Sequence, residues 1–175
     1  MGAYTLFADV LDYPGPDWPA ALARCRAEAG GGELEAFAAA VSGLTPGQLQ
    51  EAYTAAFDMQ PEMTLNTGYH IFGDDYARSL FLAQLAEIYR AQGFGAGSEL
   101  PDHACLLLRF LDRGGGPACD GLAEEGLAPA LARVAERLEA ARHPYGHLLR
   151  AIVAALPPPG LELARAERSV LPVLS

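Results

Sequence analysis

Apolar residues recur every three or four positions through most of this chain, and this spacing limits the possible folds more than any other feature. In the stretch LTPGQLQEAYTAAFD, the residues Leu49, Ala52, Tyr53, Ala56 and Phe57 would share one side of a helix. No segment shows the alternation of apolar and polar residues that is typical of a half-buried strand. The pattern therefore predicts an all-α fold.

Glycine and proline separate the expected helices. Thr45 is the predicted N-cap of one helix, with Pro46 at its first position and Gln48 completing a capping box. The expected helices lie at about residues 3–12, 17–29, 33–42, 46–57, 74–92, 101–113, 122–142 and 144–156. Residues 58–72 have no clear period and are expected to form a loop with room for one helical turn.

The length of 175 residues favours one domain with a sizeable core. We expect a single helical bundle of seven to nine helices over residues 1–160. The run PPPG at 157–160 ends it, and residues 161–175 are expected to be a loosely attached tail. The chain has no apolar run of about 20 residues, as a membrane span needs, and its N-terminus has no basic segment of a signal peptide. It is expected to be cytoplasmic.

The formal net charge is −10, and the 12 basic residues are all arginine. Nucleic-acid binding requires a basic patch, and the sequence shows none. An acidic protein suits a cationic partner such as a basic peptide. The alternative is that the acidic residues only confer solubility.

The sequence gives little support to a metal site or an active site. His143 and His147 are four residues apart, but Pro144 and Gly146 lie between them and no third ligand is apparent. No G-x-S-x-G elbow is present. Cysteines are few, and none form a CxxC pair. We expect no enzymatic activity, no metal and no cofactor.

Residues 68–79, GYHIFGDDYARS, gather aromatic and acidic residues. Asp74 or Asp75 is expected to cap the helix that follows, which leaves the other aspartate free. Each of Tyr69, Phe72 and Tyr76 is by itself readily explained as a core residue. Together with an unpaired acid they would form a surface for an apolar peptide with arginines, because carboxylates bind guanidinium groups well.

Three motifs follow one another in a fixed order: YTAAFD at 53–58, GYHIFGDDYARSLFLAQLAEIYRAQGF at 68–94, and ELPDHACLLLRFL at 99–111. In this order and spacing the chain resembles the TorD/NarJ-type chaperones of molybdenum enzymes (the DMSO reductase family). The family has a Tyr-x-x-x-Phe-Asp helix end, an aromatic loop with a Gly-Asp/Glu-Asp/Ser-Tyr helix start, and a Glu-x-Pro-Asp-His motif that opens a buried helix. The stretch LDYPGPDW is similar to the family's first Tyr-Pro turn.

The resemblance implies an all-helical chaperone without catalytic activity. Its partner would be the molybdopterin-containing catalytic subunit of a respiratory or nitrate-assimilating enzyme. The chaperone would bind the apoenzyme and its N-terminal leader, often of the twin-arginine type, until the cofactor is inserted. Proteins of molybdenum-cofactor biosynthesis would be further partners, and the choice between monomer and dimer stays open.

By position, the resemblance also implies the residues that contact the leader. They are Tyr69, His70, Phe72, Asp74, Asp75, Tyr76, Glu99, Pro101, Asp102 and His103. The helix starts near Asp74 and Pro101 are expected to meet in space, with the leader in a groove between them. Asp102 is expected to be an acid of the first helical turn, favoured by the helix dipole.

The sequence leaves two alternative functions open. One is a small helical enzyme that uses His103 with Asp102 or His70. The other is a generic acidic adaptor that binds no leader.

Overall fold

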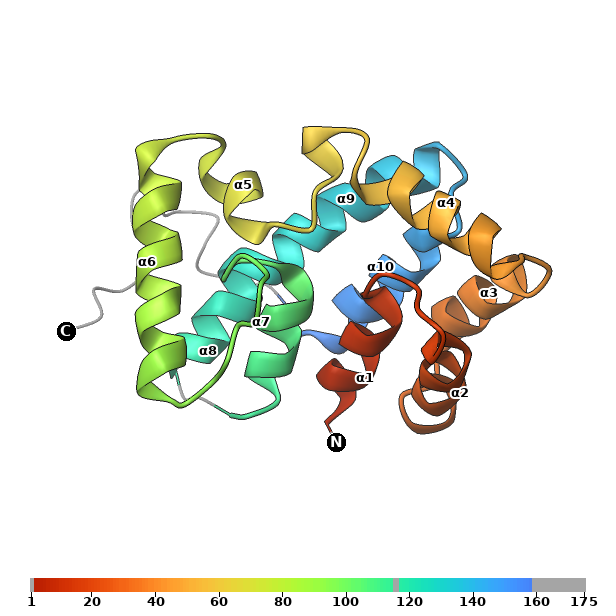
Figure 1. Cartoon of the computed structure of the whole chain (residues 1–175), viewed down its shortest axis with the longest axis horizontal. Helices are drawn as coiled ribbons and strands as arrows, with labels where there is room; N and C mark the ends of the chain where they lie inside the picture. The colour runs from red at the N-terminus through yellow and green to blue at the C-terminus, as the bar shows by residue number, and fades with distance from the viewer. Residues whose placement is uncertain (1, 115–116, 159–175) are drawn as a thin grey trace.

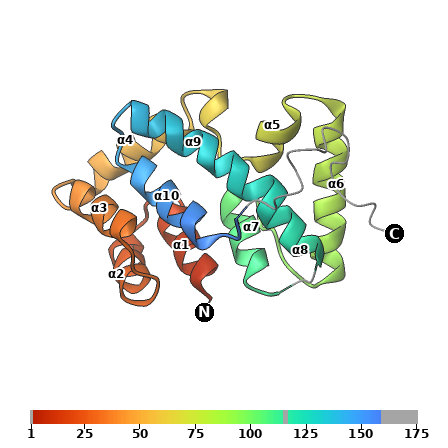
Figure 2. The same ribbon diagram turned by 180° about the vertical axis from the view of Figure 1, so that it is seen from behind.

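The computed structural model describes residues 2–114 and 117–158, and the regular elements in this part of the chain are all helices, without a strand of any sheet. Figures 1 and 2 show the arrangement. The helices are α1 (Ala3–Leu11), α2 (Trp18–Glu28), α3 (Gly32–Val41), α4 (Pro46–Phe57), α5 (Thr67–Phe72), α6 (Tyr76–Ala91), α7 (Ala104–Leu111), α8 (Pro117–Gly121), α9 (Ala128–Ala140) and α10 (Tyr145–Ala155). A 3₁₀ turn, η1 (Pro61–Met63), and a π-helix, η2 (Leu122–Leu127), complete the set. The all-α prediction is confirmed, and the expected tail at 161–175 lies outside the described residues.

Local capping signals place the start of α4 as expected. The Gln48 amide donates to Thr45 Oγ1 at 3.2 Å, and the Thr45 amide donates to Gln48 Oε1 at 2.9 Å. Each side chain thus satisfies a backbone amide that the helix itself leaves unpaired. The predicted capping box is confirmed.

The predicted start of the central helix is wrong by three residues, because α7 begins at Ala104 and not at Pro101. Residues 100–103 instead form a turn, closed by a hydrogen bond from the His103 amide to the Leu100 carbonyl at 3.0 Å, and His103 forms an isolated antiparallel bridge with Asn66. Here the Thr67 amide donates to the Asp102 carbonyl at 2.9 Å, and the Ala104 amide donates to the Leu65 carbonyl at 2.8 Å. These bonds to a distant segment replace the first helical turn, so Asp102 is not a first-turn acid.

Two further expectations need correction. Residues 58–72 were expected to form a loop with room for one helical turn, and they contain more helix than that: the turn η1 and the six-residue helix α5. The long helix expected at 122–142 is divided, with the π-helix η2 before α9. Pro129 lies in the first turn of α9, and it lacks the amide hydrogen that a continuous α-helix would use there.

The core is centred on α10, which packs against α9 and α3, while α1 packs against α7 and α2. Tyr145 of α10 lies fully buried among three aromatic rings, with its centroid 5.2 Å from Phe37, 5.8 Å from Tyr53 and 5.2 Å from Phe57. In Figure 1, α6 stands at one edge of the molecule, away from this centre. Among the helices of the described residues, none is both long enough and apolar enough to cross a membrane.

Two buried tyrosines differ in whether their hydroxyl group has a hydrogen-bond partner, and comparing them tests what that partner contributes to stability. The Tyr145 hydroxyl is buried and has no hydrogen-bond partner in the described part of the chain, whereas the Tyr89 hydroxyl donates to the Pro101 carbonyl at 2.7 Å. Tyr145→Phe removes an unpaired polar group, so it is expected to raise the free energy of unfolding by about 1 kcal/mol. Tyr89→Phe is expected to lower it by about 1 kcal/mol. Urea unfolding of both variants checks this, and a loss in both would contradict it.

Candidate functional site

The edge helix α6 buries one narrow stripe and leaves apolar side chains on its outer face. Phe81, Leu85 and Tyr89 face inward. On the outer face, Tyr76 is 73% exposed and Leu80, one turn later, is 50% exposed. Contiguous exposed apolar groups can mark a surface that a partner covers, and these two side chains are neighbours because they lie one helical turn apart.

The start of α6 is acidic. Asp75 is its N-cap, since Asp75 Oδ1 accepts a hydrogen bond from the Ala77 amide at 3.3 Å. This confirms that one of the two aspartates caps the helix and identifies which one. Asp74 is exposed. An acidic group and two apolar side chains therefore share this end of α6.

The aromatic residues of α5 are half-buried. Phe72 packs on Phe81 of α6, with the ring centroids 5.4 Å apart. The His70 ring nitrogen Nε2 donates to the Thr64 carbonyl at 2.7 Å. Burial lowers the pKa of His70 below its ordinary value, which favours the neutral ring at neutral pH. Phe72 and His70 thus attach α5 to its neighbours and offer only part of their surface to a partner.

Asp102 lies inside the protein, with no exposed surface. Its Oδ2 accepts hydrogen bonds from the Gly68 amide at 3.0 Å and from Arg78 Nε at 3.3 Å. Its backbone carbonyl accepts from Thr67. Asp102 therefore joins the start of α5, the first turns of α6 and the segment that leads into α7.

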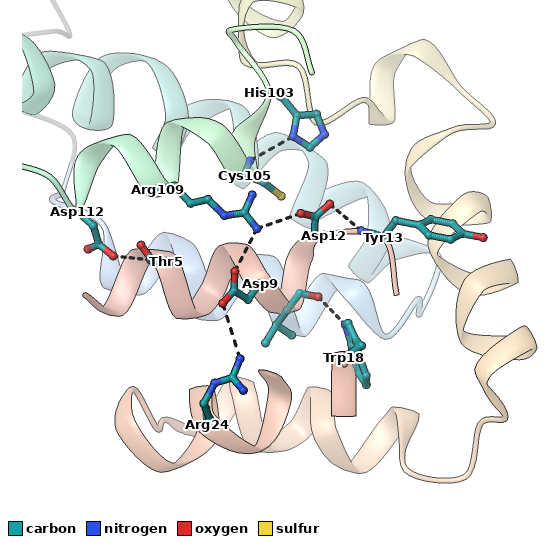
Figure 3. Close-up of polar contacts among 11 residues, drawn as sticks. Thr5, Asp9, Asp12, Tyr13, Trp18, Arg24, His103, Cys105, Arg109 and Asp112 are labelled. Atoms are coloured by element: carbon teal, nitrogen blue, oxygen red, sulfur yellow. Dashed lines mark hydrogen bonds and ion pairs between the residues drawn. The ribbon is translucent and has the colours of Figure 1, made fainter. Parts of the chain in front are cut away.

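His103 contacts different groups from its neighbour. Its Nδ1 accepts a hydrogen bond from the Cys105 amide at 3.4 Å, so the ring caps α7 (Figure 3). Burial lowers the pKa of His103, and the capping bond requires an unprotonated Nδ1. Asp102 is paired with Arg78 and not with this histidine, so the structure does not form the Asp102–His103 pair that one version of the enzyme alternative uses.

Exposure divides the ten sequence-predicted contact residues into three groups. Asp74, Asp75, Tyr76 and Glu99 are exposed; Tyr69, His70, Phe72, Pro101 and His103 are half-buried; Asp102 is buried. The structure brings the start of α5, the start of α6 and the segment before α7 together, as expected, through Asp102. Whether the residues bind a peptide stays a prediction.

A comparison with models of protein families shows to which family the chain belongs. Residues 24–151 match the family model described as nitrate reductase delta subunit. The chain belongs to this family. A search of curated proteins finds no matching relative.

The nitrate reductase delta subunit family is a family of chaperones for molybdoenzyme maturation, which act with molybdoenzyme catalytic subunits. The match covers all three motifs that carry the resemblance to TorD/NarJ-type chaperones, so that resemblance is confirmed. Within residues 2–114 and 117–158, no three histidine, cysteine, aspartate or glutamate side chains lie close enough to hold a metal ion together. A chaperone family implies binding without bond chemistry.

Three residues of this candidate site were not predicted from the sequence: Gly68, Arg78 and Leu80. Leu80 could have been found, because it follows Tyr76 by one helical turn. Arg78 and Gly68 had no local signal, since their role depends on Asp102, which is 24 and 34 residues further along the chain.

A second acidic and aromatic surface lies at the turn between α1 and α2. It is a pocket of about 320 Å³, and Tyr13, Trp18, Asp9 and Asp12 are among its lining residues. Figure 3 shows Arg109 of α7 reaching both aspartates, with its Nη2 3.1 Å from Asp9 Oδ1 and 3.0 Å from Asp12 Oδ2. These carboxylates already hold a guanidinium group, which links α1 to α7.

Proposed function

We propose that this chaperone binds the N-terminal leader of a molybdopterin-containing catalytic subunit on the outer face of α6. In this proposal the leader is of the twin-arginine type, and the chaperone holds the apoenzyme in the cytoplasm until the cofactor is inserted. The observation that carries the proposal is the exposure of Tyr76 and Leu80 beside the acidic start of the helix.

The chemistry of this face fits such a leader. Tyr76 and Leu80 offer an apolar strip of one helical turn, suited to the apolar segment of a leader, and exposed tyrosines are frequent anchors in interfaces. Asp74 is exposed beside them and suits an arginine. The net charge of −10 attracts a cationic segment from a distance at low salt. Glu99, also exposed, adds acidic character to the segment before α7.

The apolar strip can be tested directly with a synthetic peptide that carries two adjacent arginines followed by an apolar run. Tyr76→Ser combined with Leu80→Ser is expected to weaken peptide binding about tenfold or more, because a buried tyrosine anchor contributes on the order of 2 kcal/mol. The folding stability should change little, since both side chains are exposed. Calorimetry measures the affinity and urea unfolding measures the stability.

Tyr13→Ser combined with Leu44→Ser is the matched control. These residues are also an exposed tyrosine and an exposed leucine, but they lie in the turns that follow α1 and α3. The control variant should bind the peptide as the unmodified protein does. Equal losses in both variants, or no loss in either, would contradict the assignment of the leader to α6.

The acidic part is tested by Asp74→Asn together with Asp75→Ser. Serine is a good N-cap, so the helix start is preserved while two negative charges are removed. Binding of the same peptide should weaken at low ionic strength and approach that of the unmodified protein at high salt, because salt screens exposed charges.

A further inference from the structure

Asp102 was expected to contact the leader, but its carboxylate is not accessible to one. The side chain has no exposed surface, and one oxygen already accepts hydrogen bonds from Gly68 and Arg78. The other oxygen, Oδ1, is buried and has no partner in the described part of the protein. A leader arginine could reach this group only if the surrounding structure opened.

The contacts of Asp102 connect three segments that are distant in sequence. Its side chain binds the Gly68 amide of α5 and the guanidinium group of Arg78 on α6, and its backbone belongs to the segment that leads into α7. The preceding residue, Pro101, accepts the hydrogen bond from Tyr89, further along α6. The edge helix is thus attached at two points to two adjacent residues.

The approach at Gly68 is close enough to require glycine. A Cβ atom there would lie 2.8 Å from Asp102 Oδ2 and 2.9 Å from Phe81 Cδ1, distances that side-chain carbons do not adopt. The start of α5, the carboxylate and the inner face of α6 therefore meet at Gly68 without room for a Cβ atom.

We propose that Asp102 is a positioning residue, which sets the placement of α5 and α6 and thereby of the exposed face that receives the leader. Arg78 acts together with Asp102, and we call this ion pair the clamp. The inference rests on the proposed leader binding for its functional consequence, but the placement of the helices can be measured without any peptide.

The first part of the test follows hydrogen exchange in the full-length protein. Asp102→Asn keeps an acceptor for the Gly68 amide and removes the charge that holds Arg78, while Arg78 is partly exposed and can turn to water. Amides of residues 67–79 are expected to exchange at least about fivefold faster, while those of α10 stay unchanged. Unchanged exchange at 67–79 would overturn the clamp.

The second part distinguishes positioning from contact, with two peptides: the twin-arginine peptide above, and its copy with both arginines replaced by glutamine. A positioning residue weakens binding of both by the same factor, and its effect is non-additive with that of Arg78→Gln. A contact residue would weaken only the arginine peptide, which would overturn the proposal.

Ile152→Val in α10 controls for a general loss of stability. Ile152 is fully buried in the core, so this variant is destabilised without a change at the clamp. It should bind both peptides as the unmodified protein does and keep the exchange of residues 67–79. If the unmodified protein binds neither peptide, the leader assignment fails, while the exchange experiment still decides the role of Asp102.

Discussion

Arg78→Ala is expected to lower the free energy of unfolding by about 3 kcal/mol. The substitution leaves the carboxylate of Asp102 buried and without its counter-charge, and breaking a buried ion pair in this way is costly. The loss lies at the lower end of the range for buried pairs, because Arg78 is itself 18% exposed and water can enter part of the vacated space. Urea unfolding measures the effect.

Arg150→Ala provides a comparison that separates the effect of burial on an ion pair from the effect of its hydrogen-bond distances. Arg150 binds Glu139 through two hydrogen bonds of 2.7 Å, a better geometry than the single 3.3 Å contact of Arg78. The Arg150 side chain is 33% exposed and the Glu139 side chain 40%. The expected loss of unfolding free energy is therefore within about 1 kcal/mol. A larger loss for Arg150→Ala than for Arg78→Ala would show that distance, and not burial, dominates in this protein.

Gly68→Ala is expected to lower the free energy of unfolding by about 1–3 kcal/mol, the usual cost of overpacking. The added Cβ would meet the Asp102 carboxylate and the Phe81 ring, neither of which can retreat into solvent, since both are buried. The same variant should speed hydrogen exchange at the start of α5, because the amide of residue 68 can no longer approach Asp102 closely.

Gly47→Ala is the matched control. Gly47 also lies in the first turn of a helix, α4, but a Cβ there would have open space around it. Alanine restricts the unfolded chain and favours the helix, so this variant should be more stable by up to about 1 kcal/mol. Opposite signs for the two variants, measured by thermal unfolding, would show that packing decides the effect at Gly68. A stabilised Gly68→Ala would contradict the close approach.

The parts of the fold that sequence could predict are those with local causes. The caps at Thr45 and Asp75 use side chains within three residues of the amides that they bind, so a short window contains all the information. The apolar spacing likewise placed most of the long helices within a few residues. The family motifs singled out Asp102 and its neighbours in sequence. They did not show that Asp102 is buried and bonded to Gly68 and Arg78.

The parts that sequence could not predict have distant causes. Helix α7 begins only at Ala104 because the backbones of Asp102 and Ala104 bind those of Thr67 and Leu65, and no pattern within residues 101–104 records that pairing. Asp102 after a proline has the form of a helix start, and only the fold reveals that Gly68 and Arg78 occupy its oxygen. Similarly, α5 is too short to show a helical period.

The outer and inner faces of α6 differ in what they contribute to folding. Tyr76 and Leu80 are 73% and 50% exposed, whereas Phe81, Leu85 and Tyr89 are buried and hold the helix in place. Under the proposed leader binding, the outer residues can therefore be exchanged, and the preference for a client altered, at little cost to folding. If the leader binds there as proposed, the outer face of α6 is the segment to exchange when the chaperone is to be redirected to a new enzyme.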